Sequence, residues 1–247
     1  MARLKDKVAI ITGAGRGIGR ATAKLFASEG AKVAVISRTS DNVAQVVSEI
    51  TSSGGIAHGI TCDVSDREQL ELAVKTVFET FGAVDILVNN AFDPSQVFSS
   101  LLDLSPTQLL RNFEMGPISY LHAMQACHPY LKASEQGRII NLGSMAGIIG
   151  YAGMGPYNMA KEAVRALTRT AAREWGADGI TVNNILPLAQ TWDSTVDVPL
   201  PSNALNRFGS PEADIAPVLL FLASKDAQFL TGYSFTPDGG AIIDSAR

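Results

Sequence analysis

Short apolar runs alternate along the chain with longer segments in which apolar residues recur at helical spacing. The short runs are rich in β-branched residues and occupy 8–12, 32–37, 59–62, 86–89, 138–142, 181–186 and 233–236. The first, second and fourth runs are apolar almost throughout, which is typical of strands covered by helices on both faces. The pattern therefore predicts buried parallel strands.

The helical segments predicted between these runs are 18–29, 41–52, 66–81, 106–132, 156–176 and 211–223. Strand and helix alternate throughout, which implies parallel strands joined by right-handed crossovers. We therefore predict an α/β fold: a doubly wound, Rossmann-like parallel sheet of about seven strands with helices on both faces. No repeat or linker divides the chain, so 1–247 is expected to form one domain. Only 188–207 resists assignment, and with Pro199 and Pro201 it predicts a short substrate loop at the surface.

Composition narrows the range of partners. Hydrophobic residues make up 46% and charged residues 18%, which suits one large core rather than a disordered chain. The formal net charge of −4 argues against non-specific nucleic-acid binding. No uncharged apolar run approaches the ~18 residues that span a bilayer. Cys62 and Cys127 provide neither a disulfide framework nor a set of metal ligands. We expect a cytoplasmic protein with no membrane, nucleic-acid or metal partner.

The first strand-to-helix turn reads Thr12-Gly-Ala-Gly-Arg-Gly-Ile-Gly19. Glycines at such a turn let the backbone approach a pyrophosphate, which the following helix N-terminus attracts. The spacing is Gly13-x-x-x-Gly17-x-Gly19 rather than G-x-G-x-x-G, because Ile18 stands where the last glycine of that motif belongs. Its place after the first strand and before a helix predicts a dinucleotide site.

The end of the second strand bears on the choice of cofactor. An acidic residue there binds the adenosine ribose of NAD, whereas an arginine accommodates the 2′-phosphate of NADP. This chain has Ser37-Arg38 with no acid, and Arg16 in the glycine turn adds a second cation. Guanidinium groups form charge-assisted pairs with phosphate, so NADP(H) is favoured over NAD(H). The other interpretation is that Arg38 is a solvated surface charge.

With these motifs, the chain resembles the short-chain dehydrogenase/reductase family from about Val8 to Gly240. Asp63-Val64 resembles the family's adenine-contacting pair, and Asn89-Asn90-Ala91 resembles its "NNAG" motif with Phe92 in place of the glycine. Ser144, thirteen residues before Tyr157, and the Tyr157-x-x-x-Lys161 pattern resemble its catalytic residues. The cofactor-binding residues expected from the glycine turn, the arginines and this resemblance are Gly13, Arg16, Gly17, Ile18, Gly19, Ser37, Arg38, Asp63, Val64, Asn90, Ala91, Tyr157, Lys161 and Pro187.

The expected chemistry centres on Tyr157. Tyr157 and Lys161, four residues apart, lie on one helical face. A free phenol has a pKa of about 10, and a neighbouring ammonium is expected to lower it. Tyr157 is then the acid that protonates a carbonyl oxygen, or the base in the reverse direction. Ser144 is expected to hydrogen-bond that oxygen, and the resemblance implies that Lys161 also binds the nicotinamide ribose.

Besides Phe92, two further positions depart from the family pattern. Gly116 stands where the family has a catalytic asparagine, and Gly116-Pro117 is expected to weaken or kink its helix. Asn112, one turn earlier, is a possible substitute, and Gly116→Asn is expected to raise kcat. Leu188 follows Pro187 where the family has a glycine.

The leading hypothesis is an NADPH-dependent carbonyl reductase, or alcohol dehydrogenase, acting on a small-molecule ketone or secondary alcohol. One alternative is a cofactor-binding relative with little or no turnover. A second is a 3-oxoacyl-carrier-protein reductase. A dehalogenase-like relative is disfavoured because the glycines and Lys161 are present. Family analogy implies a homotetramer or homodimer with an interface on the helices 106–132 and 156–176.

Overall fold

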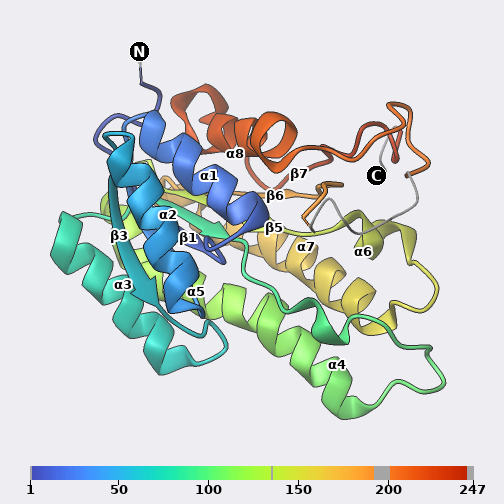
Figure 1. Cartoon of the computed structure of the whole chain (residues 1–247). Helices are drawn as coiled ribbons and strands as arrows, with labels where there is room; N and C mark the ends of the chain where they lie inside the picture. The colour runs from blue at the N-terminus through green and yellow to red at the C-terminus, as the bar shows by residue number, and fades with distance from the viewer. Residues whose placement is uncertain (1, 135, 192–200, 244–247) are drawn as a thin grey trace.

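The computed structural model describes residues 2–134, 136–191 and 201–243 (Figure 1). Among these residues seven strands form one parallel sheet in the order β3-β2-β1-β4-β5-β6-β7. The strands are β1 (Val8–Thr12), β2 (Lys32–Ser37), β3 (Ile56–Thr61), β4 (Ile86–Asn89), β5 (Arg138–Leu142), β6 (Thr181–Ile185) and β7 (Ser234–Phe235). The strand order and the parallel pairing confirm the predicted Rossmann-like fold.

Helices connect the strands on both faces of the sheet. The α-helices are α1 (Gly17–Ser28), α2 (Ser40–Ser52), α3 (Arg67–Phe81), α4 (Pro106–Phe113), α5 (Ser119–Ala133), α6 (Met145–Ile149), α7 (Gly155–Trp175) and α8 (Ala216–Ala223). Two π-helical turns, η2 (Glu114–Ile118) and η4 (Pro211–Ile215), precede α5 and α8. Short 3₁₀ turns are η1 (Pro94–Gln96), η3 (Gly176–Asp178) and η5 (Lys225–Ala227). None of the described helices is both long and apolar enough to span a bilayer.

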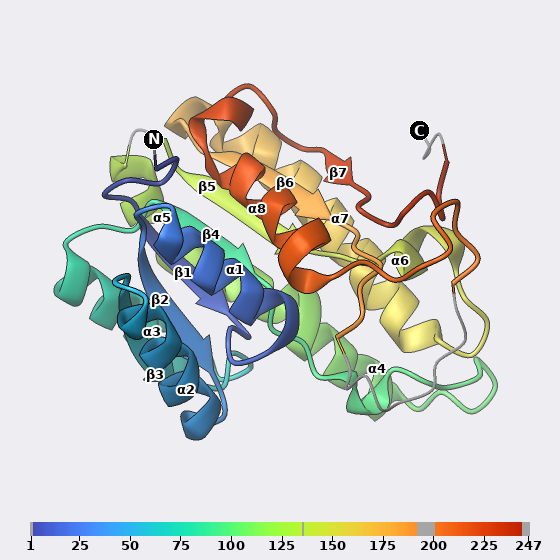
Figure 2. The same cartoon turned by 45° about the horizontal axis from the view of Figure 1, so that its top comes forward.

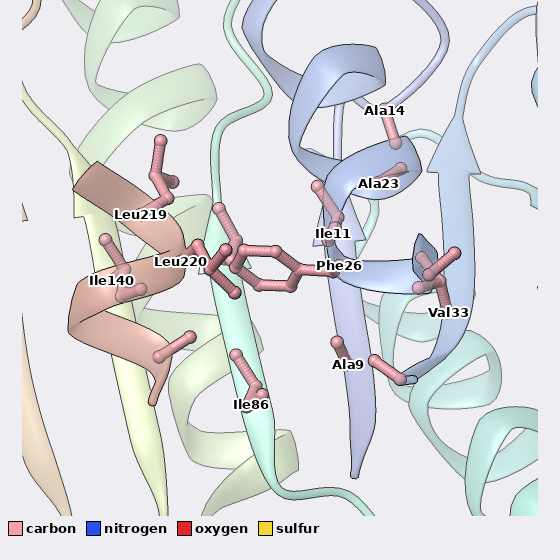
Figure 3. Close-up of a cluster of buried hydrophobic side chains, with 14 of the residues drawn as sticks. Ala9, Ile11, Ala14, Ala23, Phe26, Val33, Ile86, Ile140, Leu219 and Leu220 are labelled. Atoms are coloured by element: carbon pink, nitrogen blue, oxygen red, sulfur yellow. The ribbon is translucent and has the colours of Figure 1, made fainter. Parts of the chain in front are cut away.

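Side chains along the central strands alternate between the two faces of the sheet, so each face has its own hydrophobic core. Ile11 of β1 packs on the face covered by α1, α2 and α8, whereas the preceding Ile10 packs on the face covered by α3, α5 and α7. Both side chains are fully buried. On the first face α1 and α8 lie side by side (Figure 2). The buried ring of Phe26 extends from α1 toward Leu220 of α8 (Figure 3).

Several predicted elements differ from the structure. The third strand begins at Ile56, three residues before the predicted start at 59, because this edge strand is only partly buried and its first half lacks an apolar run. The predicted helix over 211–223 is a π-helical turn followed by α8. The short helix α6, directly after Ser144, was not predicted, since five residues are too few to show a periodicity. Residues 192–200 of the predicted substrate loop lie outside the described residues.

The segment predicted as one helix over 106–132 is α4, η2 and α5 in succession. Gly116 leaves helical geometry at φ −111° and ψ −106°, and Pro117 has no N–H for the helical ladder. The expected kink is therefore confirmed. Such π turns place one extra residue inside a helix and often lie at functional sites.

The site is positioned by the order of the strands. The chain leaves β1 on one side toward β2 and returns to pair β4 on the other side of β1. In open α/β sheets ligands bind beyond the carboxyl ends of strands at such a reversal. The glycine turn after β1 and the Asn-rich segment after β4 therefore meet at this edge.

Candidate active site

The glycine turn packs directly against the segment that follows β4. The hydroxyl of Thr12 accepts hydrogen bonds from the backbone N–H groups of Asn90 (3.0 Å) and Ala91 (3.2 Å). The Asn90 amide donates to the carbonyl oxygens of Thr12 (2.9 Å) and Gly13 (3.1 Å). Gly13 has φ +64°, and a Cβ there would lie 2.8 Å from the Cα of Ala91. Only glycine suits this close and left-handed position.

The N-terminus of α1 is open to an anion. Arg16 at the N-cap makes no side-chain cap, and the first turn carries no acidic residue. The first N–H groups of a helix lack partners within the helix and carry partial positive charge. Gly17 begins the helix and lines the adjacent cavity, where a Cβ would come within 3.6 Å of Thr191. These features fit the pyrophosphate of a dinucleotide.

A cavity of about 660 Å³ lies at the carboxyl ends of β1, β2 and β4. It is bordered by most of the residues expected to bind the cofactor: Gly13, Arg16, Gly17, Ile18, Ser37, Arg38, Val64, Asn90 and Ala91. The structure therefore brings the glycine turn, the arginines and the Asn-Ala segment around one space.

Five expected cofactor residues lie apart from the walls of this cavity: Gly19, Asp63 and Pro187, and the catalytic candidates Tyr157 and Lys161 described below. Gly19 packs behind the glycine turn, where a Cβ would come 2.4 Å from the carbonyl oxygen of Gly13. The carboxylate of Asp63 accepts from the N–H (2.9 Å) and hydroxyl (2.7 Å) of Ser65, and so stabilises its own turn. Pro187 is half-buried, and the next residue, Leu188, is held by Pro237 and Gly209 through its backbone.

Other residues of the cavity wall were not singled out as cofactor residues from the sequence. These are Thr39, Asn42, Cys62, Phe92, Pro94, Met115 and Thr191. Thr39 and Asn42 follow β2, and Cys62 follows β3. These residues lie at or just beyond the carboxyl ends of predicted strands, and this position could have identified them from the sequence. Among the described residues, no group of His, Cys, Asp or Glu side chains is arranged to hold a metal ion.

Ser144 ends the segment after β5 and forms the N-cap of α6. Its hydroxyl oxygen accepts from the N–H of Ala146 at 3.1 Å, which fixes the side chain at the start of the helix. The same hydroxyl lies near enough to the Tyr157 phenol on α7 to lower its pKa. The two hydroxyls expected to contact a substrate oxygen therefore lie together.

Burial raises the pKa of Tyr157, and the nearby Ser144 hydroxyl opposes this only in part. The expectation that a neighbouring ammonium would lower this pKa is therefore wrong: desolvation of the phenolate outweighs the charge-stabilising contacts. Tyr157 retains some solvent exposure. Near neutral pH it is a protonated phenol, which is the form that donates.

Lys161 lies one helical turn after Tyr157 and is 3% exposed. Its ammonium donates to the carbonyl oxygen of Leu142 at 2.8 Å. The nitrogen also lies 4.4 Å from the ring centroid of Phe92, 5.5 Å from that of Tyr120 and 5.7 Å from that of Tyr157. We call these three rings and the Leu142 carbonyl the lysine cage. Burial lowers the pKa of Lys161 to about 7, while the carbonyl and the ring faces favour the charged form.

Phe92 connects the cavity to these catalytic candidates. It borders the cavity, and its ring lies 5.2 Å from that of Tyr157 at 72°, an edge-to-face contact. Tyr157 and Lys161 therefore lie against this ring next to the cavity, and Ser144 lies near Tyr157. Asn112, the possible substitute for the family asparagine, instead donates its amide to the carbonyls of Gln96 and Gln108 at 3.0 Å each.

The family model for short chain dehydrogenase matches residues 7–196. The 12α-hydroxysteroid dehydrogenase of Clostridium sp. is 36% identical over 95% of this chain and 96% of its own. The cyclohexanol dehydrogenase of Acinetobacter sp. is 34% identical over 96% and 95%. The 3-oxoacyl-[acyl-carrier-protein] reductase of Thermotoga maritima is 33% identical over 98% and 100%. A variant of a Serratia marcescens short-chain dehydrogenase/reductase has a similar structure, with a TM-score of 0.89, 34% identity and coverage of 97% and 99%.

Proposed function

Because the chain belongs to the short-chain dehydrogenase/reductase family, we propose that it is an NADPH-dependent carbonyl reductase that also oxidises the corresponding alcohol. Members of this family are oxidoreductases that act on CH–OH and C=O groups of small molecules with nicotinamide cofactors. One observation carries the proposal: Ser144, Tyr157 and Lys161 meet beside the cavity bordered by the glycine turn.

The side chains suit proton transfer to a carbonyl oxygen. A bound nicotinamide supplies the hydride in reduction and accepts it in oxidation. Tyr157 donates its proton to the oxygen as negative charge develops there. The Ser144 hydroxyl, fixed by the N–H of Ala146, orients and stabilises the same oxygen. Lys161 supplies positive charge one turn away from the phenol when it is protonated.

The arginines beside the cavity support NADP(H). Arg16 and Arg38 both border it, together with Ser37 and Asn42. A 2′-phosphate carries more negative charge than a ribose hydroxyl, so guanidinium groups at this end favour the phosphorylated cofactor.

The names of two relatives support a ketone or secondary alcohol as substrate. One relative is named for cyclohexanol and another for a hydroxysteroid. The second candidate function, reduction of a 3-oxoacyl thioester, is favoured by several relatives named as 3-oxoacyl-[acyl-carrier-protein] reductases at 33–35% identity.

A substrate panel tests the proposal. Purified protein is assayed with NADPH and NADH against cyclohexanone, a 12-oxosteroid and a 3-oxoacyl thioester, and in reverse against the alcohols. We expect turnover with NADPH and a cyclic ketone. Tyr157→Phe, which keeps the ring and removes the proton, should lower kcat by at least ~100-fold. Tight cofactor binding without turnover on any substrate would instead support the cofactor-binding alternative.

We also propose that the chain forms a homodimer or homotetramer through α4 and α7. Apolar side chains are exposed around α4, namely Phe98 (74%), Leu101 (76%), Leu102 (98%) and Leu110 (58%), and Met159 of α7 is 39% exposed. Exposed apolar side chains gathered in one region mark protein interfaces. Light scattering coupled to size-exclusion chromatography measures the mass, and a monomer across the micromolar range contradicts the proposal.

A further inference from the structure

Phe92 and Gly116 meet beside the lysine cage. Phe92 follows β4, and Gly116 lies in the π turn between α4 and α5, 24 residues later in the sequence. A Cβ added at Gly116 would lie 3.4 Å from the Cε2 atom of Phe92 and 3.7 Å from the Cβ of Ala160. A methyl group is therefore accommodated, but a longer side chain has to displace the ring.

The same ring contacts Lys161 from the side of the cavity. Of the three cage rings, Phe92 has its centroid nearest to the ammonium nitrogen, at 4.4 Å. On another side, the Leu142 carbonyl accepts from both Lys161 (2.8 Å) and the Tyr120 hydroxyl (3.3 Å). The ammonium is thus held between a carbonyl oxygen and ring faces, both of which attract a cation.

Within the described part of the chain, the ionisable groups of the cage are Tyr120 on α5, Tyr157 on α7 and Lys161 itself. Burial raises the pKa of both phenols, so neither carries charge near neutral pH. The β5 segment contributes a backbone carbonyl, and the segment after β4 contributes the Phe92 ring. Lys161 is therefore the group of the cage that titrates near pH 7.

We propose that Phe92 is a positioning residue for Lys161 and forms a matched pair with Gly116, its ring filling the space that the family asparagine takes. The proposal rests on the proposed function, in which Lys161 supports proton transfer by Tyr157. The ring keeps Lys161 charged and fixed against Leu142, so that it acts locally on Tyr157. An asparagine added at position 116 alone therefore does not restore the family arrangement, because the Phe92 ring occupies the space. We accordingly expect Gly116→Asn to lower kcat, whereas the sequence alone predicted a rise.

The first test measures the charge of Lys161 directly, without cofactor or turnover. Protein labelled with ¹³C at the lysine ε carbon is titrated by NMR, and Lys161→Met identifies the resonance. We expect Phe92→Leu to lower the pKa of Lys161 by about one unit, because a ring face over a desolvated cation stabilises its charged form. Phe92→Tyr keeps a ring and should leave the pKa close to that of the wild type. An unchanged pKa in Phe92→Leu overturns the proposal.

If Phe92→Leu does not fold, Phe92→Met takes its place in the same comparison. With an active substrate, the fall of kcat/KM at high pH should move to lower pH by the same unit in the leucine variant. Loss of packing alone lowers the rate without moving this pH profile. Because the NMR titration needs no substrate, it still decides the proposal when the proposed reaction is not found.

The second test is a double-mutant cycle on kcat. Gly116→Ala is the control and should stay within about twofold of wild type, since a Cβ is accommodated. Gly116→Asn should lower kcat about tenfold, and Phe92→Gly should lower it by a similar factor. The double variant, with Phe92→Gly and Gly116→Asn, should be more active than either single variant. If the two single losses of kcat instead multiply in the double variant, the two residues act independently and are not a matched pair.

Discussion

The carboxylate of Asp93 lies 3.5 Å from the guanidinium of Arg38, so the arginine expected to bind a 2′-phosphate already has an acidic neighbour. Asp93 comes from the segment after β4, 55 positions away, and also lies 4.0 Å from Arg111. Burial alone would raise the pKa of Asp93, but hydrogen bonds with Ser95 and the two arginines lower it overall. Asp93 is therefore ionised at neutral pH, and with the proposed NADP(H) it would compete with the 2′-phosphate for Arg38.

Arg38→Ala should reduce kcat/KM for NADPH by at least ~10-fold and leave kcat/KM for NADH within about twofold, because a charge-assisted hydrogen bond contributes about 1.5–3 kcal/mol. Parallel kinetics with the two cofactors measure the ratio. Arg67→Ala is a matched control, since Arg67 is 57% exposed and pairs within its own helix. An equal loss with both cofactors would assign Arg38 a structural role.

Asp93→Asn should act in the opposite direction. The variant keeps the shape of the side chain and removes the charge that competes with phosphate, so the Kd of NADPH should fall about two- to fivefold. The Kd of NADH should change less. Fluorescence titration of both cofactors measures the effect, and weaker NADPH binding would show that Asp93 orients Arg38 rather than competing for it.

Gly19→Ala should destabilise the protein and weaken cofactor binding together. The added Cβ would lie 2.4 Å from the carbonyl oxygen of Gly13 and 2.6 Å from the amide nitrogen of Asn90, so the glycine turn has to move. Overpacking of this kind costs about 1–3 kcal/mol. Gly176→Ala is the control, because no heavy atom lies within 4 Å of its added Cβ. Urea unfolding and NADPH titration of both variants test the prediction, and equal stability would contradict it.

Much of this site can be predicted from the sequence, because the residues concerned lie close together along the chain. Tyr157 and Lys161 share a helix whose period is readable, and the glycine turn follows a strand of unbroken apolar residues. Phe92 was recognised only as a departure from the family pattern. Its contacts with Lys161 and Gly116 depend on three segments distant in sequence and on the non-helical geometry of Gly116. Likewise Arg38 follows β2 and Asp93 follows β4, and only β1 lies between these two strands in the sheet. The contact between the two side chains therefore depends on the strand order.

Lys161 should make the stability of the protein depend on pH. Its pKa is about 7 in the folded chain and 10.5 as the ordinary value, so between these values the unfolded chain binds the extra proton. The free energy of unfolding therefore rises with pH across this window, at up to about 1.4 kcal/mol per unit. Lys161→Met should remove this dependence and be more stable than wild type, most strongly below pH 7.

The measurement is urea unfolding of both proteins without cofactor from pH 6 to 9.5. Tyr120 and Tyr157 do not interfere, because burial raises both pKa values above the ordinary value of 10.0. A difference between the two proteins that stays constant across the range would mean that Lys161 is charged throughout, with the cage outweighing desolvation.

A buried polar chain ties the catalytic helix to the sheet, and Thr168→Val should weaken it. The amide of Asn89 donates to Asn141 at 2.9 Å, and the Asn141 amide donates to the Thr168 hydroxyl at 2.9 Å. Valine keeps the volume of threonine but leaves the Asn141 amide with only its weak contact to the sulfur of Met124 at 3.7 Å. A buried donor deprived of its partner costs about 1–3 kcal/mol.

The control is Thr76→Val. The hydroxyls of Thr168 and Thr76 each donate to a helix carbonyl at 2.9 Å, but the bond of Thr76 is exposed, so water replaces it. Thr168 lies on α7 with Tyr157 and Lys161, and Asn141 lies on β5 just before Ser144. Loosening this connection should therefore lower kcat more than it raises KM, since it disturbs the alignment of Ser144 with Tyr157 rather than the cofactor cavity. If urea unfolding shows equal losses for Thr168→Val and Thr76→Val, the buried chain does not hold the helix.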